Sequence, residues 1–281
     1  MAPVLVGTAA AVGAAGTAEG PAGVSWWRFA CALIVALSVQ VGTNYANDYS
    51  DGRRGTDDPG ERVGPPRLVG NGLVEPARVR SAMLVSFAVT LLAGAPLVLF
   101  VDWRLALVGV AAVAAGWFYT GGPRPYGYAG LGELFVFVFF GLVATLGSTW
   151  VQSEQLPAVA WLAAVAMGAL STAMLVVNNL RDIAGDARAG KVTLAVRMGD
   201  RATRVLYVAL LLVAFLLLPA MVAAGASAVV AVGFVAVVMG RRAVLAVLSG
   251  ARGTSLLQVL ATTGVVQLVY SLAVMVGLAI P

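Results

Sequence analysis

Two short polar runs hold the residues of this chain that are best suited to chemistry. Their polar members are Asn44, Asn47, Asp48 and Asp51 in the first run and Asn178, Asn179, Asp182 and Asp186 in the second. In both runs the carboxylates lie three or four residues apart, so a helix would place them on one face. Each run follows a long apolar segment, where carboxylates are costly unless a cation binds to them. We therefore interpret the pair as a cation site.

The composition limits which cation can bind there. The chain has no histidine and a single cysteine, Cys31, which lies inside an apolar stretch. Oxygen ligands alone favour Mg²⁺, which is held by one or two carboxylates and completes its coordination with water and substrate phosphates. The predicted Mg²⁺ ligands, which are also the predicted catalytic residues, are Asp48, Asp51, Asp182 and Asp186.

Basic residues beside both runs point to a phosphate. Arg181, Arg188 and Lys191 surround the second run, and several arginines follow the first. Carboxylates interleaved with cations suit a Mg²⁺–diphosphate complex, because the metal binds the carboxylates and the cations bind the remaining phosphate oxygens. The predicted substrate-binding residues in and around the runs are Asn44, Asn47, Arg54, Asp57, Arg67, Asn178, Asn179, Arg181 and Lys191. The alternative is that both runs are ordinary solvated helix ends, which their occurrence at two equivalent positions makes less attractive.

A third polar stretch, residues 119–133, joins two apolar segments. Its glycines and prolines predict ordered turns. We expect Tyr119, Arg124 and Tyr126 to face the same cavity as the two runs and to bind substrate there. Glu133 lies just inside the next apolar segment, where a charge is expensive. The alternative is a plain connector whose tyrosines lie at the membrane interface.

The overall composition is that of a membrane protein. Of the 281 residues, 60% are hydrophobic and 11% are charged, whereas about a quarter of the residues in a soluble domain are charged. The mean hydropathy is +0.92. A net charge of +5 is compatible with nucleic-acid binding, but the basic residues lie in short loops between apolar segments. We therefore expect the lipid bilayer, and no nucleic acid, as a partner.

Nine apolar segments divide the chain. They cover approximately residues 2–18, 26–45, 81–101, 105–119, 131–151, 157–177, 205–223, 226–240 and 256–280. Most approach the ~20 residues that span the hydrocarbon core. The predicted fold class is all-α: a polytopic membrane protein with about nine transmembrane helices, bundled around a central cavity open to the cytoplasmic side. We expect a single domain, residues 1–281, built from two pseudo-repeated halves with motifs at 44–57 and 178–191.

The distribution of basic residues predicts the orientation. Every Lys and Arg except Arg28 and Arg104 lies in a loop that follows an even-numbered segment. The positive-inside rule makes those loops cytoplasmic. Both polar runs then face the cytoplasm, and an odd number of spans leaves the C-terminus outside.

At these motifs the sequence resembles the UbiA superfamily of intramembrane prenyltransferases, and within it the menaquinone-pathway branch. The matching stretches are residues 47–57, 64–67, 119–128, 130–133 and 178–197. Each occupies its expected place, and together they extend along nearly the whole chain. The resemblance implies nine helices with two aspartate-rich motifs and Mg²⁺ as the cofactor. It also implies the plasma membrane of a prokaryote, with the active site facing the cytoplasm.

The same resemblance implies a reaction between a polyprenyl diphosphate and 1,4-dihydroxy-2-naphthoate. Mg²⁺ bridges the diphosphate to the four aspartates, the allylic carbon becomes carbocation-like, and the naphthoate ring attacks it with loss of CO₂ to give demethylmenaquinone. Such chemistry needs leaving-group activation and a dry apolar cavity, and no histidine or serine nucleophile. Two alternatives stay open: a family member with another acceptor (4-hydroxybenzoate, a porphyrin or a phospho-sugar), and a cation-coupled transporter.

Overall fold

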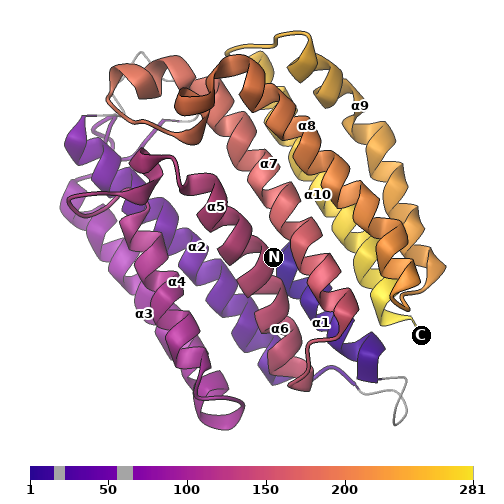
Figure 1. Cartoon of the computed structure of the whole chain (residues 1–281). Helices are drawn as coiled ribbons and strands as arrows, with labels where there is room; N and C mark the ends of the chain where they lie inside the picture. Colours follow the sequence, from indigo (N-terminus) through magenta and orange to yellow (C-terminus); the bar gives the residue numbers. More distant parts are fainter. Residues whose placement is uncertain (16–22, 56–65, 281) are drawn as a thin grey trace.

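The chain folds into a bundle of helices (Figure 1). The computed structural model describes residues 1–15, 23–55 and 66–280, and within these ranges it has no strand. The helices up to the long connector are α1 (Ala2–Ala15), α2 (Trp26–Arg54), α3 (Pro76–Phe100) and α4 (Leu105–Phe118). The elements after it are η1 (Tyr126–Ala129), α5 (Gly132–Val136), η2 (Phe137–Val143), α6 (Ala144–Ser153), α7 (Ala158–Arg188), α8 (Leu194–Ala223), η3 (Ala228–Phe234), α9 (Val235–Leu248) and α10 (Ser255–Ala279).

Seven helical stretches in the described residues are long and apolar enough to cross a membrane. Two of them are composite, because α5, η2 and α6 run on as Gly132–Ser153, and η3 and α9 as Ala228–Leu248. The two remaining apolar helices, Ala2–Gly13 and Leu105–Phe118, are shorter. The all-helical membrane fold is therefore confirmed, whereas a total of nine spanning segments stays a prediction.

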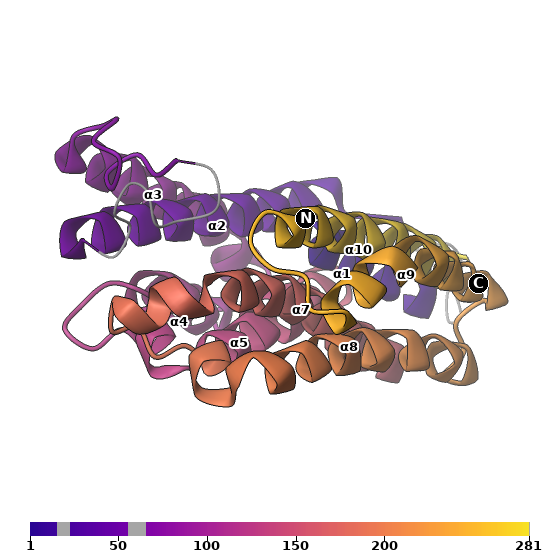
Figure 2. The same ribbon diagram turned by 90° about the horizontal axis from the view of Figure 1, so that it is seen from above.

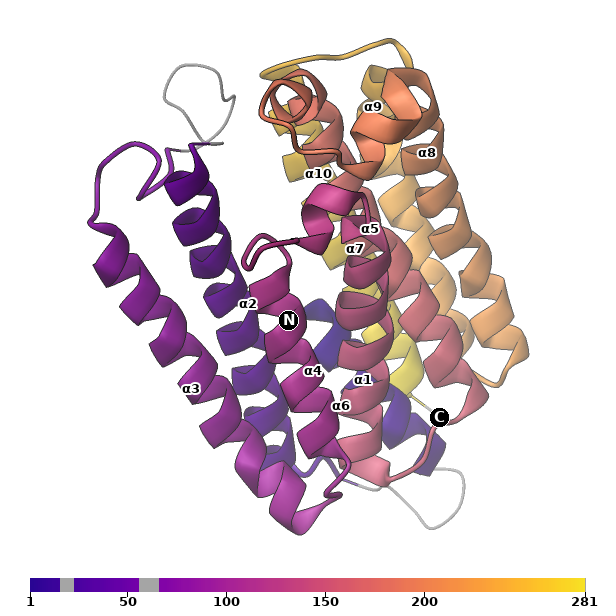
Figure 3. The same cartoon turned by 60° about the vertical axis from the view of Figure 1, so that its left-hand side comes forward.

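The helices form two groups. In the first, α2, α3 and α4 pack against one another, and Figure 3 shows them standing beside the rest of the bundle. In the second, α7 packs against α8, α10, η2 and α1. The helix α7 is the core of the protein, since 61% of its most apolar window is buried against 11% for α2. Seen from above, α2 and α3 lie on the opposite side of the bundle from α7 and α8 (Figure 2).

Glycines allow the helices of the second group to approach closely. A side chain on Gly141 of η2 would collide with the backbone of Gly168 on α7. The π-helical turn η2, which surrounds Gly141, begins at Phe137, whose ring lies against Gly168. Such contacts between small residues are the usual means of packing helices in a bilayer, where lipid removes the hydrophobic incentive.

The helices that carry the polar runs are longer than their apolar segments predicted. The expected ends lay near residues 45 and 177, but α2 continues to Arg54 and α7 to Arg188. Likewise α8 begins at Leu194 and not near residue 205, with a break at Gly199, where φ is 78°. The bounds of the apolar segments differ from the helix ends because hydropathy marks contact with lipid, whereas these turns are polar. For both runs the spacing of the polar residues had predicted a helix. Both polar runs consequently lie within helices.

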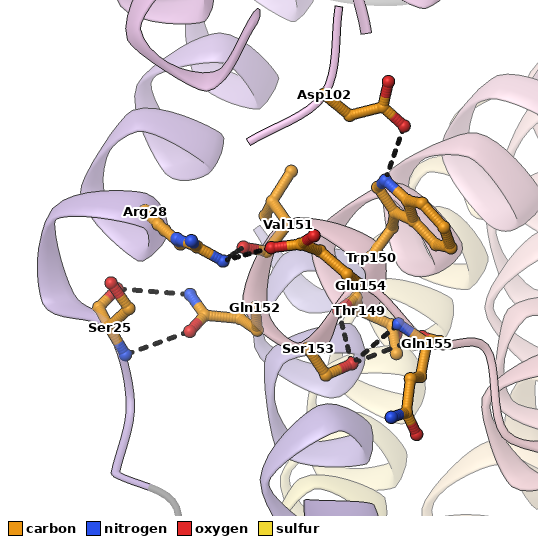
Figure 4. Close-up of polar contacts among 10 residues, drawn as sticks. All are labelled: Ser25, Arg28, Asp102, Thr149, Trp150, Val151, Gln152, Ser153, Glu154 and Gln155. Carbon is orange, nitrogen blue, oxygen red and sulfur yellow. Dashed lines mark hydrogen bonds and ion pairs between the residues drawn. The ribbon is translucent and has the colours of Figure 1, made fainter. Parts of the chain in front are cut away.

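At the end of the bundle opposite the polar runs, α6 joins the two groups by hydrogen bonds (Figure 4). Gln152 exchanges two hydrogen bonds with the backbone of Ser25, just before α2, at 3.0 and 3.2 Å. Arg28 donates to the Val151 carbonyl at 2.9 Å and pairs with Glu154 at 3.4 Å. These contacts give partners to Arg28, which is one of the two basic residues that do not lie in the predicted cytoplasmic loops.

Candidate active site

A cavity of about 1290 Å³ lies between the two groups of helices. Most of its polar lining residues are from α2, α7 and the segments that follow them, and from the connector between α4 and α5. They include Asn44, Asn47, Asp51, Arg67, Tyr119, Thr120, Tyr126, Asn178, Asn179, Arg181, Asp182, Asp186, Arg188 and Lys191. The structure thus brings both polar runs and the connector together around one cavity.

Three predicted site residues are not among the described residues that line the cavity. Asp48 and Arg54 point elsewhere from α2. Arg124 is exposed, as is Pro123, and a role for Arg124 in binding substrate stays a prediction. Asp57 lies outside the residues that the structure describes.

The first run is bound by segments that lie far from it in the sequence. The carboxylate of buried Asp48 accepts hydrogen bonds from the backbone N–H groups of Leu68 at 2.9 Å and Val69 at 2.8 Å. The carboxylate of Asp51 accepts one from the Tyr128 hydroxyl at 2.9 Å. Within the described residues, then, Asp48 organises the loop before α3, while Asp51 faces the cavity.

The second run is bound mainly by residues close to it in the sequence. Arg181 donates to both oxygens of Asp182, at 2.7 and 2.6 Å, and also to Asn178 at 2.9 Å. Asp186 accepts a hydrogen bond of 3.4 Å from Thr193, which also caps the start of α8. A guanidinium and a carboxylate therefore lie side by side at the cavity wall.

Lys191 connects the two runs. Its Nζ lies 3.5 Å from the Asp51 carboxylate and 5.2 Å from the centre of the Tyr128 ring. Burial alone would lower the pKa of Lys191, but the carboxylates of Asp51 and Asp186 act more strongly together and raise it. The ammonium group therefore stays charged at neutral pH and offers a fixed positive charge to an anionic ligand.

The connector is bound to the first run. The Thr120 hydroxyl donates to Asn47 at 2.9 Å, and Arg54 donates to the carbonyls of Thr120 and Gly122. The guanidinium of Arg54 also lies over the Tyr128 ring, 5.3 Å from its centre. These contacts do not fit a plain connector. They also give Arg54 a partner in the connector, apart from the cavity.

Aromatic rings continue from the connector into α5 and η2. Tyr126 lies 5.5 Å from Tyr119 and stacks on Phe135 at 3.9 Å, and Phe135 stacks on Phe139 at 6.0 Å, between ring centres. The Tyr126 hydroxyl donates to the Ala115 carbonyl at 2.8 Å, which holds its ring in place. Burial raises the pKa of Tyr119 to about 12. Its hydroxyl is thus protonated at neutral pH and can donate a hydrogen bond.

Three residues make contacts at the site but were not among the predicted site residues. They are Thr120, Tyr128 and Glu133. The first two lie in the polar connector, so their presence near the cavity followed from the sequence, but their partners Asn47 and Asp51 did not. Glu133 stood out in the sequence only as an expensive charge.

The fold and the lining of the cavity can now be compared with known proteins. Residues 2–255 match the UbiA prenyltransferase family. The chain belongs to the UbiA prenyltransferase family. It is 49% identical to the 1,4-dihydroxy-2-naphthoate octaprenyltransferase of Mycobacterium tuberculosis, over 99% of this chain and 92% of that protein. It is 46% identical to the enzyme of the same name from Mycobacterium leprae, over 98% of this chain and 90% of that protein.

The fold of the chain also resembles that of a solved membrane protein. A structure described as digeranylgeranylglyceryl phosphate synthase in membranes has a TM-score of 0.62, with 13% identity, over 99% of this chain and 93% of that one. At this identity the likeness concerns the fold alone. The UbiA chain described here therefore shares the helical membrane architecture of that protein.

The oxygen donors of the cavity fit Mg²⁺ bound together with a phosphate. Asp51, Asp182 and Asp186 line the cavity with the amide side chains of both runs. In the described part of the chain no three acidic side chains are close enough to enclose an ion by themselves. Mg²⁺ is commonly held by one or two carboxylates, with water and substrate phosphates completing its octahedron. The arrangement therefore suits an ion that arrives with a diphosphate.

Proposed function

We propose that this UbiA protein transfers a polyprenyl group from a polyprenyl diphosphate to 1,4-dihydroxy-2-naphthoate. Diphosphate and CO₂ are released, and demethylmenaquinone is formed. The observation that carries the proposal is that both polar runs line one cavity with other walls that are apolar. The choice of acceptor is supported by the names of the mycobacterial relatives.

In the proposed complex the diphosphate binds between the two runs. Asp51, Asp182 and Asp186 hold Mg²⁺, which supplies positive charge to stabilise the departing diphosphate. Arg181 and Lys191 line the same part of the cavity and donate to the remaining phosphate oxygens. Asp48 as a further ligand stays a prediction, since its carboxylate is bound by the loop before α3.

The polyprenyl tail occupies the apolar part of the cavity. Its walls include Val35 of α2, Val98 of α3, Val108 of α4 and Phe139 of η2. Leu99 also lines the cavity and is 74% exposed at the bundle surface. A wall of such residues supports a lateral opening through which a long tail and the membrane-soluble product reach the lipid. The same apolar walls exclude water from the allylic cation.

The proposed orientation places the diphosphate end of the cavity at the cytoplasmic face and the C-terminus outside. The support is the charge asymmetry of the loops. A cation-coupled transporter fits this site less well, because the carboxylates of a transporter would bind a cation without an accompanying anion. Here Arg181 and Lys191 accompany the carboxylates, which suits an anionic ligand.

The test uses the purified full chain in lipid nanodiscs with Mg²⁺ and a polyprenyl diphosphate. We expect a prenylated naphthoquinone and CO₂ from dihydroxynaphthoate, and no product once a chelator removes Mg²⁺. In parallel, 4-hydroxybenzoate is offered as the acceptor. A higher kcat/KM for 4-hydroxybenzoate would overturn the acceptor assignment, and the absence of prenyl transfer to any acceptor would overturn the proposed function.

A further inference from the structure

Glu133 is a buried carboxyl group to which the proposed function gives no role. It lies in the first turn of α5 and is 5% exposed. Its Oε1 accepts a hydrogen bond of 2.8 Å from Nδ2 of Asn179, and its Oε2 has no hydrogen-bond partner among the described residues. A buried carboxyl group with so few partners is costly. Its position beside the cavity therefore calls for a functional reason.

The hydrogen bond decides which way the Asn179 amide faces. With Nδ2 bound to Glu133, the amide oxygen Oδ1 is the atom left for other partners, and Asn179 lines the cavity. The reversed amide would set Oδ1 against the carboxylate oxygen, and two acceptors repel each other. The neighbouring Asn178 differs, because its Oδ1 accepts from Arg181.

Aromatic rings lie close to Glu133, the partner of Asn179. Tyr119, Tyr126 and Phe135 line the same cavity and form the stacked group described above. The ring of Tyr119 borders Gly132, the residue immediately before Glu133. An amide oxygen beside flat aromatic walls suits a flat ring that carries a hydroxyl group. An anionic phosphate, by contrast, would be repelled by that oxygen.

We propose that Asn179, Tyr119 and the Tyr126–Phe135 pair form the subsite for the hydroxylated aromatic ring of the acceptor. Asn179 Oδ1 accepts the hydrogen bond of an acceptor hydroxyl, and Glu133 is the positioning residue that turns this oxygen toward the cavity. The inference rests on the proposed function, in that it assumes an aromatic acceptor bearing a hydroxyl group.

The decisive variant is Glu133→Gln. Glutamine has nearly the same size, but its side chain can either accept from or donate to an amide, so both orientations of Asn179 become accessible. We expect the KM for dihydroxynaphthoate to rise about five- to tenfold, as for the loss of one hydrogen bond. The KM for the polyprenyl diphosphate and the Mg²⁺ dependence should stay within about twofold of wild type.

The matched control is Glu154→Gln, the same change at the opposite end of the bundle (Figure 4). It should leave both KM values unaltered, since the Glu154 side chain pairs with Arg28 and lies away from both polar runs. A second variant exchanges the chemistry of the pair. In Glu133→Gln/Asn179→Asp, the glutamine amide donates to the new carboxylate, which again presents an oxygen to the cavity. This pair should have a lower acceptor KM than Asn179→Asp alone, where two carboxyl groups meet.

Three results would overturn the inference while wild type turns over naphthoate: an unchanged acceptor KM in folded Glu133→Gln, a change confined to the diphosphate KM, or no recovery in the exchanged pair. Thermal unfolding of each variant in nanodiscs reports whether it is folded. Failure of the proposed function is recognised separately, because the wild-type protein would then prenylate no naphthoate.

Discussion

The two polar runs are alike in sequence and different in their partners. The first is bound by distant segments, since Asp48 accepts from the backbone of residues 68–69 and Asp51 from the connector. The second is bound mainly within its own helix, where Arg181 donates twice to Asp182. The first run therefore shapes the loops around the cavity, while the second carries its own cation. Sequence repetition has not produced equivalent sites.

The position of each helix explains this difference. The helix α7 is the core of the bundle and is surrounded by other helices. The polar residues of the second run therefore find partners on α7 itself, on α5 or at the start of α8. The helix α2 belongs to the outer group, and its polar end meets the loop before α3 and the connector. Loops offer backbone N–H groups and hydroxyls, which are the partners that the first run has.

The largest expected effect tests whether both runs serve one site. Asp182→Asn and Asp51→Asn should each lower kcat at least about a hundredfold, since each removes a charge that the leaving group's Mg²⁺ needs. Product formation is measured by chromatography with Mg²⁺ titrated. Asp102→Asn, at the Trp150 contact of the opposite end, should retain turnover. Near wild-type activity in Asp182→Asn or Asp51→Asn would show that the two runs do not serve one site.

An intermediate effect is expected where the runs meet. Lys191→Met should raise the KM for the polyprenyl diphosphate about tenfold, because one charged donor to phosphate is lost. Arg242→Met, an exposed residue of α9, is the control with the same change in charge. Equal KM values in both variants would remove Lys191 from the diphosphate site.

The pH dependence of this contact has a definite sign. The pKa of Lys191 is raised in the folded protein, so its contribution to stability is fully present below the unfolded value of about 10.4 and is lost as the pH rises through the folded value. Lys191 should therefore add no pH dependence to the diphosphate KM between roughly pH 6 and 9.

The smallest effect is expected for Asp48, whose carboxylate binds the loop before α3, whereas Asp51 and Asp182 line the cavity. Asp48→Asn replaces an acceptor-only carboxylate by an amide that can accept from one of the two backbone N–H groups. The amides of Leu68 and Val69 should exchange hydrogen with solvent about tenfold faster, as expected for one charge-assisted hydrogen bond. Hydrogen-exchange mass spectrometry of residues 66–75 measures this. If Asp182→Asn increases the exchange rates of the same amides equally, the effect of Asp48→Asn does not come from its hydrogen bonds to Leu68 and Val69.

Part of the site followed from the sequence because spacing on a helix is a local property. Polar residues recur every three to four residues within each run. They are Asn44, Asn47 and Asp51 in the first and Asn178, Asp182 and Asp186 in the second. This spacing predicted polar helix faces, and all six residues line the cavity. Helix ends were harder, because hydropathy fell where α2 and α7 became polar although the helices continued. The pairing of Glu133 with Asn179 was also out of reach, since a residue separation of 46 carries no local signal.

By itself the sequence determined a helical membrane protein with two oxygen-rich, cation-flanked runs, since composition and periodicity depend only on neighbouring residues. Only the tertiary structure decided which oxygens face the cavity, because that depends on competition among partners brought in from elsewhere in the chain. Asp48 is bound by the loop before α3, and Asp51 is bound by Tyr128 of the connector. Asn179 was turned by a carboxylate on another helix.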